Sequence, residues 1–320
     1  MQLELDFGIE PEKSGQRNEP AAEQHLQAEN RLMLVDGMAL LFRAYFATSF
    51  TGTIRRTSAG LPTNAVHGFV RYFWDAVQKF GPSHVVCCWD MGSKTFRTEQ
   101  YTGYKANRPD APLDLIPQFD LVKDVVESFG ICNVGLNGYE ADDCIGTLAK
   151  RHASDANVFV LTGDQDMLQL VDQRITVLIM KKGIGNYAVY TPEFLLEERN
   201  LTPAQIIDLK GLMGDTSDNY PGVRGIGEKT ALKLVQEYGT IEDILERLPE
   251  LSKAVRTKIE ADLEMLHLSR DLARIRCDVP ISHPFDEYSW TLNRAQVMSK
   301  FEELEFGSLG KLITGKAGIA

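Results

Sequence analysis

Nine carboxylates stand at five places in this chain, each inside a short signature sequence. The signatures read LMLVDG, VVCCWD, YEADD, LTGDQD and GDTSDN. Their acids are Asp36, Asp90, Glu140, Asp142, Asp143, Asp164, Asp166, Asp215 and Asp218. If the fold gathers these acids, no arrangement of nearby lysines would neutralise them, and we expect divalent metal to do so. Oxygen ligands in this number suit Mg²⁺ or Mn²⁺, and two or more such ions suit phosphodiester hydrolysis.

The elements that must position these acids are predicted by apolar runs that alternate with amphipathic stretches. Buried strands are predicted at 31–36, 84–90, 158–164 and 175–180. Amphipathic helices are predicted at 64–80, 113–129 and 140–152. Strands that alternate with helices indicate an α/β fold with a mainly parallel sheet, covered by helices on both sides. Ligands of such sheets bind beyond the carboxyl ends of the strands, so we expect Asp36, Asp90 and Asp164 to converge.

Each acid taken alone has a simpler interpretation, as an aspartate in a turn or at the start of a helix. The Asp-Gly pair after the first apolar run predicts a turn there. Glu140 and Asp143 are three residues apart at a predicted helix start, so they share a face. The alternate acids of TGDQD are expected to point toward one metal ion. Asp215 and Asp218, one helical turn apart, are expected to share a second one.

Basic and aromatic residues are interleaved in the segment 93–108, SKTFRTEQYTGYKANR, which directly follows Asp90. The basic residues are Lys94, Arg97, Lys105 and Arg108, and the aromatic residues are Phe96, Tyr101 and Tyr104. Basic side chains hold phosphates, and aromatic rings stack on unpaired bases. The segment is therefore predicted to contact DNA, and the alternative is a solvated loop.

The pattern then changes to short helices with glycine-rich joints. GVRGIGEKT is similar to a nucleotide-binding loop, but Glu228 between Gly227 and Lys229 breaks the pattern GxxxxGK[ST] and argues against ATP. We expect instead a turn of the helix–hairpin–helix type, in which Gly225 and Gly227 let backbone amides approach a phosphate. Lys229 and Lys233 follow on the next helix. Such turns bind the backbone of duplex DNA without reading its sequence.

Composition places few limits on this function. The net charge of −11 argues at first against a nucleic-acid partner. Residues 1–30 contribute −5 of it, from seven acids and two bases, and the nine clustered acids exceed the remaining −6. No apolar run approaches the roughly 20 residues of a membrane helix, and the start lacks a secretory signal. The five cysteines form no CxxC pair, which predicts reduced thiols in a cytoplasmic protein.

The ordered motifs resemble a bacterial 5′→3′ exonuclease of the flap endonuclease family, similar to the 5′-nuclease domain at the front of DNA polymerase I. The likeness runs from about residue 31 to 312 and includes LVDG, RAYFA, GYKANRP, TGDQDMLQLV, LMGDTSDNYPGVRGIGEKTA and ELEFGSL. It implies a PIN/flap-endonuclease-like fold with a helical, helix–three-turn–helix module after the sheet. Because the chain stops at Ala320, it resembles the free-standing members. It also implies a monomeric enzyme that removes flaps and RNA primers in replication and repair.

The resemblance divides the acids between two metal sites. Asp36, Asp90, Glu140 and Asp142 match residues in or beside one site. Asp164, Asp166, Asp215 and Asp218 match residues of the other, and Asp143 supports them.

The resemblance also implies roles in DNA binding. Lys105 and Arg108 match the basic pair that contacts the scissile phosphate, so with Asp142 they are the implied catalytic residues. Arg97 is assigned to DNA binding with them, and Tyr45 matches an aromatic position that supports the unpaired terminal nucleotide. Residues 211–235 match the duplex-gripping module, which often holds K⁺ on its turn carbonyls.

Three segments are expected: a disordered tail at residues 1–30, an α/β nuclease domain at 31–198, and a helical DNA-binding domain with a C-terminal extension at 199–320. Two other functions stay open. A DNA-junction binding protein with vestigial catalysis is disfavoured by the complete acid set. A ribonuclease of the related small α/β class is disfavoured by the duplex-gripping module.

The first residues carry a motif outside this resemblance. QLELDF fits the hexapeptide pattern QLxLxF, by which bacterial proteins dock on the sliding clamp. Its residues are Gln2, Leu3, Leu5 and Phe7. Apolar anchors beside one polar contact are typical of short docking peptides. The alternative is an accidental amphipathic start to a disordered tail.

Overall fold

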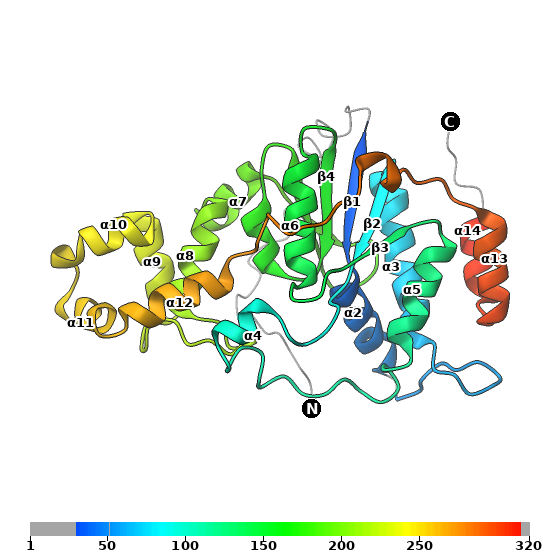
Figure 1. Cartoon of the computed structure of the whole chain (residues 1–320), viewed down its shortest axis with the longest axis horizontal. Coiled ribbons are helices and arrows are strands. Elements are labelled where there is room, and N and C mark those ends of the chain that lie inside the picture. Colours follow the sequence, from blue (N-terminus) through cyan, green and yellow to red (C-terminus); the bar gives the residue numbers. More distant parts are fainter. Residues whose placement is uncertain (1–29, 51, 315–320) are drawn as a thin grey trace.

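The computed structural model describes residues 30–50 and 52–314, so the predicted tail and QLELDF lie outside the described residues. Its centre is a six-stranded sheet with the order β3-β2-β1-β4-β5-β6 (Figure 1). The strands are β1 (Arg31–Asp36), β2 (His84–Cys88), β3 (Cys132–Val134), β4 (Asn157–Thr162), β5 (Ile175–Met180) and β6 (Tyr187–Tyr190). Strands β1 to β5 pair in parallel, and β6 runs antiparallel to β5. The predicted α/β fold is confirmed.

Helices cover both faces of the sheet because successive side chains of a buried strand point to opposite sides. The first helices are α2 (Gly37–Ser49), α3 (Asn64–Phe80), α5 (Gln118–Ser128) and α6 (Ala141–His152). Met33 and Val35 of β1 belong to the core formed with α2, α3 and α5. Leu32 and Leu34 belong to the other core, which includes α6. The helices predicted at 64–80 and 140–152 are thereby confirmed.

A row of shorter helices extends away from the sheet (Figure 1). They are α7 (Pro192–Arg199), α8 (Pro203–Met213), α9 (Glu228–Tyr238), α10 (Ile241–Glu246), α11 (Lys253–Ala261) and α12 (Leu263–Ala273). Leu212 of α8, Val235 of α9 and Leu266 of α12 are buried in the same core as α6, so the helical part is continuous with one face of the sheet. Within the described residues, no helix is both long and apolar enough to cross a bilayer.

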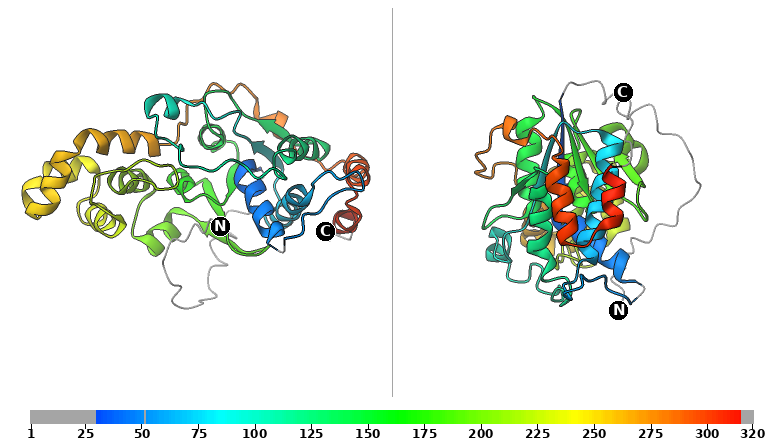
Figure 2. Two further views of the ribbon diagram at one scale, coloured as in Figure 1. Left: turned by 90° about the horizontal axis from the view of Figure 1, so that it is seen from below. Right: turned by 90° about the vertical axis from the view of Figure 1, so that its right-hand side faces the viewer.

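The end of the chain returns to the sheet. After the short helix η4 (Phe285–Tyr288) come α13 (Arg294–Glu303) and α14 (Gly307–Thr314). Phe301 packs on Phe129 with ring centroids 6.0 Å apart, and both belong to the core around α3 and α5. Figure 2 shows α13 and α14 beside these helices, far from α9 to α11. The last part of the segment 199–320 therefore packs on the α/β part of the molecule.

Three local expectations differ from the structure. The helix predicted from residue 113 begins at Gln118, because Pro117 disfavours the helical conformation of the residue before it. The edge strands β3 and β6 have only three and four residues, which is too short a pattern for the sequence to reveal them. Asp215 and Asp218 lie on a turn closed by a bridge between Asp215 and Tyr220, and not on a helix.

The turn expected after the first strand is also wrong, because α2 begins at once with Gly37. The Asp36 carboxylate accepts a hydrogen bond from the backbone amide of Ala39 at 2.9 Å and caps the helix. A Cβ on Gly37 would lie 2.6 Å from ring carbons of Trp89. Trp89 is buried and donates to Asn133 at 2.6 Å, so its ring is held in place. The glycine is required for close packing and not for a turn.

Replacing Gly37 with alanine should therefore destabilise the fold by about 1–3 kcal/mol, the usual range for overpacking a core. Gly307→Ala is a matched control, because Gly307 is also the first residue of its helix and has no atom within 4 Å of the added Cβ. We expect the control to change stability by at most about 0.5 kcal/mol. Chemical denaturation of the two variants measures both values, and equal stabilities would contradict the packing argument.

Candidate active site

Three neighbouring strands carry acids to the same edge of the sheet. Strand β1 pairs with β2 on one side and with β4 on the other. Asp36 is the last residue of β1, while Asp90 and Asp164 follow shortly after β2 and β4. The pKa of Asp36 is raised to about 7, mainly by burial; two hydrogen bonds oppose this rise, and the negative charges of Asp164 and Asp90 add to it. The three acids are therefore close enough to interact, as the strand ends predicted.

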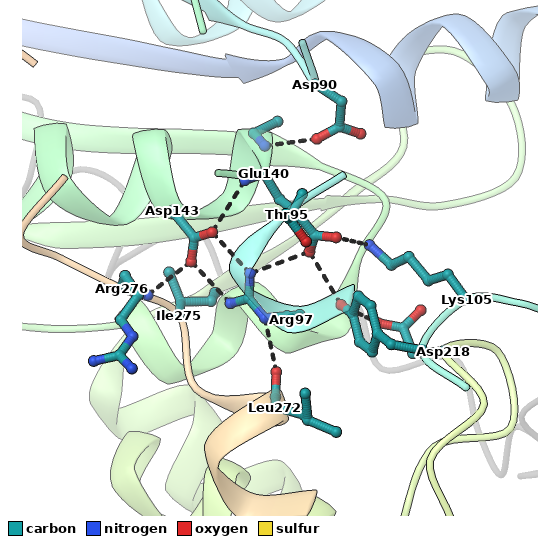
Figure 3. A network of polar contacts seen from close by, with 12 residues as sticks. Asp90, Thr95, Arg97, Lys105, Glu140, Asp143, Asp218, Leu272, Ile275 and Arg276 are labelled. Carbon is teal, nitrogen blue, oxygen red and sulfur yellow. Dashed lines mark hydrogen bonds and ion pairs between the residues drawn. The ribbon is translucent and has the colours of Figure 1, made fainter. Parts of the chain in front are cut away.

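The start of α6 adds Glu140 and Asp142 to this edge. Asp90 Oδ1 accepts a hydrogen bond from the backbone amide of Ala141 at 2.7 Å, which holds the helix start against the end of β2 (Figure 3). Among the described residues, no hydrogen bond or ion pair reaches the carboxylate of Asp142. Burial, followed by the like charges of Asp164 and Asp36, raises the pKa of Asp142 well above its ordinary value. Asp142 is thus the acid whose charge the protein compensates least.

A second group of acids surrounds Lys210 of α8. Its ammonium lies 2.7 Å from Asp166 Oδ1 and also pairs with Asp215. The pKa of Asp166 is raised to about 7, mainly by burial. The positive charge of Lys210 opposes this rise, and the negative charges of Asp164 and Asp215 add to it. Burial would also raise the pKa of Asp215, but Lys210 and the hydrogen bonds from Ser217 lower it overall. Asp164 interacts with both groups, so the two groups adjoin.

Two further cations pair with these acids. Lys105 Nζ donates to Glu140 Oε1 at 2.8 Å, and Arg108 Nη2 donates to Asp218 Oδ1 at 2.6 Å. The expectation that lysines would not neutralise the acids is therefore wrong in part. Lysine and arginine side chains pair with Glu140, Asp143, Asp166, Asp215 and Asp218. Of the nine signature acids, those without an ion pair in the described part of the chain are Asp36, Asp90, Asp142 and Asp164.

Asp143 and Arg97, predicted to support the metal-binding acids and to bind DNA, form a buried ion pair with each other. Arg97 is 2% exposed and Asp143 is 0% exposed. The guanidinium donates to both oxygens of Asp143, at 2.7 and 2.8 Å (Figure 3). The same two oxygens also accept hydrogen bonds from the backbone amides of Glu140 and Arg276. In this conformation both oxygens of Asp143 are therefore occupied by hydrogen bonds, and the Arg97 side chain is buried.

Two predicted stacking residues are also buried. Tyr45 is 7% exposed, because it lies on the core side of α2, whereas its neighbour Phe46 is 46% exposed. Tyr104 is 5% exposed. Its hydroxyl oxygen lies 3.0 Å from Glu140 Oε2 and 3.0 Å from Asp218 Oδ2, and it can donate to either. Stacking on a base is therefore excluded for both rings in this conformation. Tyr104 instead links an acid of α6 to an acid of the 215–220 turn.

The predicted duplex-gripping residues are exposed at one end of the molecule. Gly225 has a φ of +79°, which favours glycine, and the next helix begins after Gly227. Lys229 and Lys233 are exposed on α9. A Cβ on Gly214 or Gly222 would meet the backbone of the other side of the loop within 2.4 Å. These two glycines therefore allow the two sides of the loop to pack closely at its base, a structural role that the sequence did not reveal.

The chemistry of the acids fits a divalent metal ion, because four carboxylates at one edge lack a protein cation and oxygen ligands suit Mg²⁺ or Mn²⁺. Over residues 30–50 and 52–314, however, no three Asp, Glu, His or Cys side chains are already placed to hold one ion. Lys105, Lys210 and Arg108 draw several acids toward themselves. A single ion could be held by three of these acids only if the side chains rearranged.

Lys210 and Thr162 are functional candidates that the sequence did not reveal. Thr162 Oγ1 donates to Asp36 Oδ2 at 2.7 Å and orients that carboxylate. Lys210 stands between two acids of the second group. Thr162 is part of the LTGDQD signature, but that signature was noted for its acids and not for its hydroxyl group. Lys210 belongs to no acidic signature, and a single lysine in a helix is ordinarily a solvated charge.

Both parts of the chain are similar to known proteins. Residues 31–200 match the family model of the 5′-3′ exonuclease N-terminal resolvase-like domain, and residues 201–296 match that of the 5′-3′ exonuclease C-terminal SAM fold. The chain is 50% identical over 284 residues to a 5′-3′ exonuclease of Bacillus subtilis, which covers 89% of this chain and 96% of that protein. It is 40% identical to DNA polymerase I of Lactococcus lactis, over 92% of this chain but 34% of the polymerase.

Solved structures show the same fold at lower identity. The T5 D15 protein, co-crystallised with metal ions, has a TM-score of 0.62 and 22% identity over 87% of this chain and 99% of its own. The catalytic core of Rad2 in complex with DNA substrate has a TM-score of 0.56 and 17% identity over 90% of each chain. The two family models and the B. subtilis relative together cover nearly all the residues that carry the site. The chain is therefore a nuclease that belongs to the 5′-3′ exonuclease family, as its motifs indicated.

Proposed function

We propose that this chain is a divalent-metal-dependent 5′ nuclease that hydrolyses phosphodiester bonds at flaps and frayed 5′ ends of DNA. The observation that carries the proposal is the juxtaposition of uncompensated acids, above all Asp142, with the basic pair Lys105 and Arg108. A carboxylate set of this kind attracts metal, and adjacent cations attract a phosphate. The exposed Gly225–Gly227 turn on the same chain provides a binding surface for duplex DNA.

The proposed mechanism assigns a task to each group of residues. Asp36, Asp90, Glu140 and Asp142 would hold one ion, and Asp164, Asp166, Asp215 and Asp218 would hold the other. Bound metal would acidify water and stabilise the leaving oxygen. Lys105 and Arg108 would exchange their acid partners for the scissile phosphate, and would stabilise the negative charge that grows in the transition state. Their present ion pairs show that both side chains reach the acids.

Access to the acids favours particular substrates. The phosphate can reach the strand ends only when the terminal base pair opens, which costs about a few kcal/mol. Flaps and frayed ends avoid part of this cost, so we infer a preference for them, with RNA-primed 5′ ends as a further substrate. Primer and flap removal in replication and repair would be the corresponding role, carried out by a monomer in the cytoplasm. Phe46 and not Tyr45 is the exposed ring of α2 that could stack on an unpaired base.

The turn before α9 is proposed to grip the duplex beside the site. A monovalent cation such as K⁺ would help it to do so by binding turn carbonyls. Lys258 of α11 already donates to the Gly225 carbonyl at 2.8 Å, so the ion would share this carbonyl with an ammonium or use its neighbours.

Asp142→Asn should reduce cleavage of a labelled 5′-flap duplex in Mg²⁺ by at least about 100-fold, since even groups that only orient metal ligands are worth 10–100-fold. Asp215→Ala should also reduce it strongly. Asp172→Asn is the matched control, because Asp172 precedes β5 at the opposite edge of the sheet and pairs with Lys150. Single-turnover rates measure all three. A wild-type chain that binds the flap without cutting it would favour the binding-protein alternative.

Lys229→Ala combined with Lys233→Ala should weaken binding of duplex DNA and lower the slope of log affinity against log salt by about 2, because two phosphate contacts are lost. Lys311→Ala, on α14 at the other end of the molecule, should leave both quantities unchanged. Fluorescence anisotropy over a series of salt concentrations provides the measurement. An unchanged slope in the double variant would show that the turn does not grip the duplex.

The N-terminal motif QLELDF is proposed to bind the sliding clamp through Gln2 and Phe7. Immobilised clamp should retain the wild-type chain. The double variant Gln2→Ala, Phe7→Ala should bind the clamp at least about tenfold more weakly, as expected when anchor residues are truncated. Glu4→Gln changes a position that the pattern leaves free and should bind as the wild type does. Equal retention of the wild type and the double variant would contradict clamp binding.

A further inference from the structure

Helix α12 connects the turn that we propose to grip DNA with the elements that carry the acids. Near its beginning, Asp262 Oδ2 accepts a hydrogen bond from the Arg224 amide at 2.9 Å. Further along, Ser269 Oγ accepts one from the Gly222 amide at 3.1 Å. Both amides belong to the turn that precedes α9. The turn is therefore fixed to α12 at two places.

The far end of α12 is held by Arg97. Its Nε donates to the Leu272 carbonyl at 2.9 Å (Figure 3). Its Nη2 donates to the Arg274 carbonyl at 2.8 Å. A cation at the end of a helix satisfies carbonyls that lack partners within the helix. The Arg276 amide then donates to Asp143 Oδ1 at 2.8 Å. Asp143 belongs to α6 and directly follows Asp142, so this contact reaches the first group of acids.

Gln169 holds the same end of α12 from the second group. Its Nε2 donates to the Ala273 carbonyl at 3.0 Å, and its Oε1 accepts from the Ile275 amide at 2.9 Å. Gln169 lies in the short helix η2 (Gln165–Leu170), which also contains Asp166. The segment is packed tightly as well, because a Cβ on Gly146 of α6 would lie 2.6 Å from Ile275. Both elements that carry acids, α6 and η2, therefore bind the same short segment, residues 273–276.

The arginine at position 97 is chemically specific. Its five N–H groups are all used, by Asp143 twice and by Glu140, Leu272 and Arg274 once each. A lysine has three donors on one nitrogen and cannot span these partners. The pair is nearly inaccessible to water, so it does not serve as a surface charge.

We propose that Arg97, Asp143 and Gln169 form a latch that fixes the end of α12 and thereby sets which phosphodiester bond is cut. The proposal rests on the nuclease function above. Helix α12 has 11 residues and spans about 16 Å at 1.5 Å per residue. A duplex held by the turn at one end is thus kept at a fixed distance from the acids at the other. Arg97 and Gln169 are positioning residues, because they act through the acids and the backbone that they bind and not by touching the substrate.

The test uses a flap duplex with a 5′ label, cut by the full chain in Mg²⁺ and resolved to single nucleotides. The variants are Gln169→Leu and Arg97→Lys. Gln169→Leu keeps the side-chain size but removes both hydrogen bonds to the end of α12, together with the one that Gln169 donates to the Asp166 carbonyl at 2.9 Å. Val297→Ala is a stability control, because Val297 is fully buried in α13, which packs on the other side of the molecule. Binding of the duplex is measured in parallel by anisotropy.

The wild type and Val297→Ala should cut predominantly at one position. In Gln169→Leu and Arg97→Lys, the ratio of that product to its one-nucleotide neighbours should fall about tenfold, the factor that corresponds to losing a hydrogen bond of ordinary strength. Duplex affinity should stay within about twofold. If Arg97→Lys does not fold, Gln169→Leu decides the question.

An unchanged product pattern in the latch variants of an active chain would overturn the inference alone, even if they cut more slowly. An equal spread of products in Val297→Ala would overturn it as well, since general loosening would then explain the effect. A wild-type chain that cuts no bond would overturn the nuclease function together with the latch.

Discussion

Repulsion between carboxylates is the constraint on which the rest of this structure depends. Asp36, Asp142 and Asp166 all have pKa values raised by burial and by other acids nearby. A carboxyl group whose pKa is higher in the folded than in the unfolded chain lowers the free energy of unfolding at neutral pH. This loss of stability shrinks as the pH falls below the folded pKa and is gone below the unfolded pKa. The fold must therefore supply stability elsewhere to hold these acids together. Such strain is typical of functional sites.

Backbone amides at the starts of three helices hold three of the acids in place. Asp36 accepts from the Ala39 amide at the start of α2, and Asp90 accepts from the Ala141 amide at the start of α6. Asp164 accepts from the Asp166 amide at the start of η2. The amino ends of these elements favour negative charge, which offsets part of the repulsion. The simple interpretation of these residues as capping aspartates and the metal-binding interpretation are thus compatible.

The sequence predicted the strand ends well because the apolar runs and the acids that close them are adjacent in the chain. It failed where partners are distant. Arg97 and Asp143 are 46 positions apart, and Arg97 meets the end of α12 at a separation of 175, so spacing gave no sign of a buried pair. The predicted aromatic residue of α2 is Tyr45, whereas the exposed ring is that of Phe46, because one residue along a helix turns the side chain by about 100° and exchanges core for surface. Such errors need tertiary contacts to correct them.

Thermal unfolding of wild type and Asp142→Asn, each in EDTA and in Mg²⁺, tests most directly whether the acids are held in a repulsive cluster that metal relieves. Removing one charge from the cluster should raise the melting temperature in EDTA by roughly 2–4 °C. Mg²⁺ should stabilise the wild type and should have a much smaller effect on the variant, because an essential ligand is missing. A variant that melts below the wild type in EDTA, or that gains as much stability from Mg²⁺, would contradict this account.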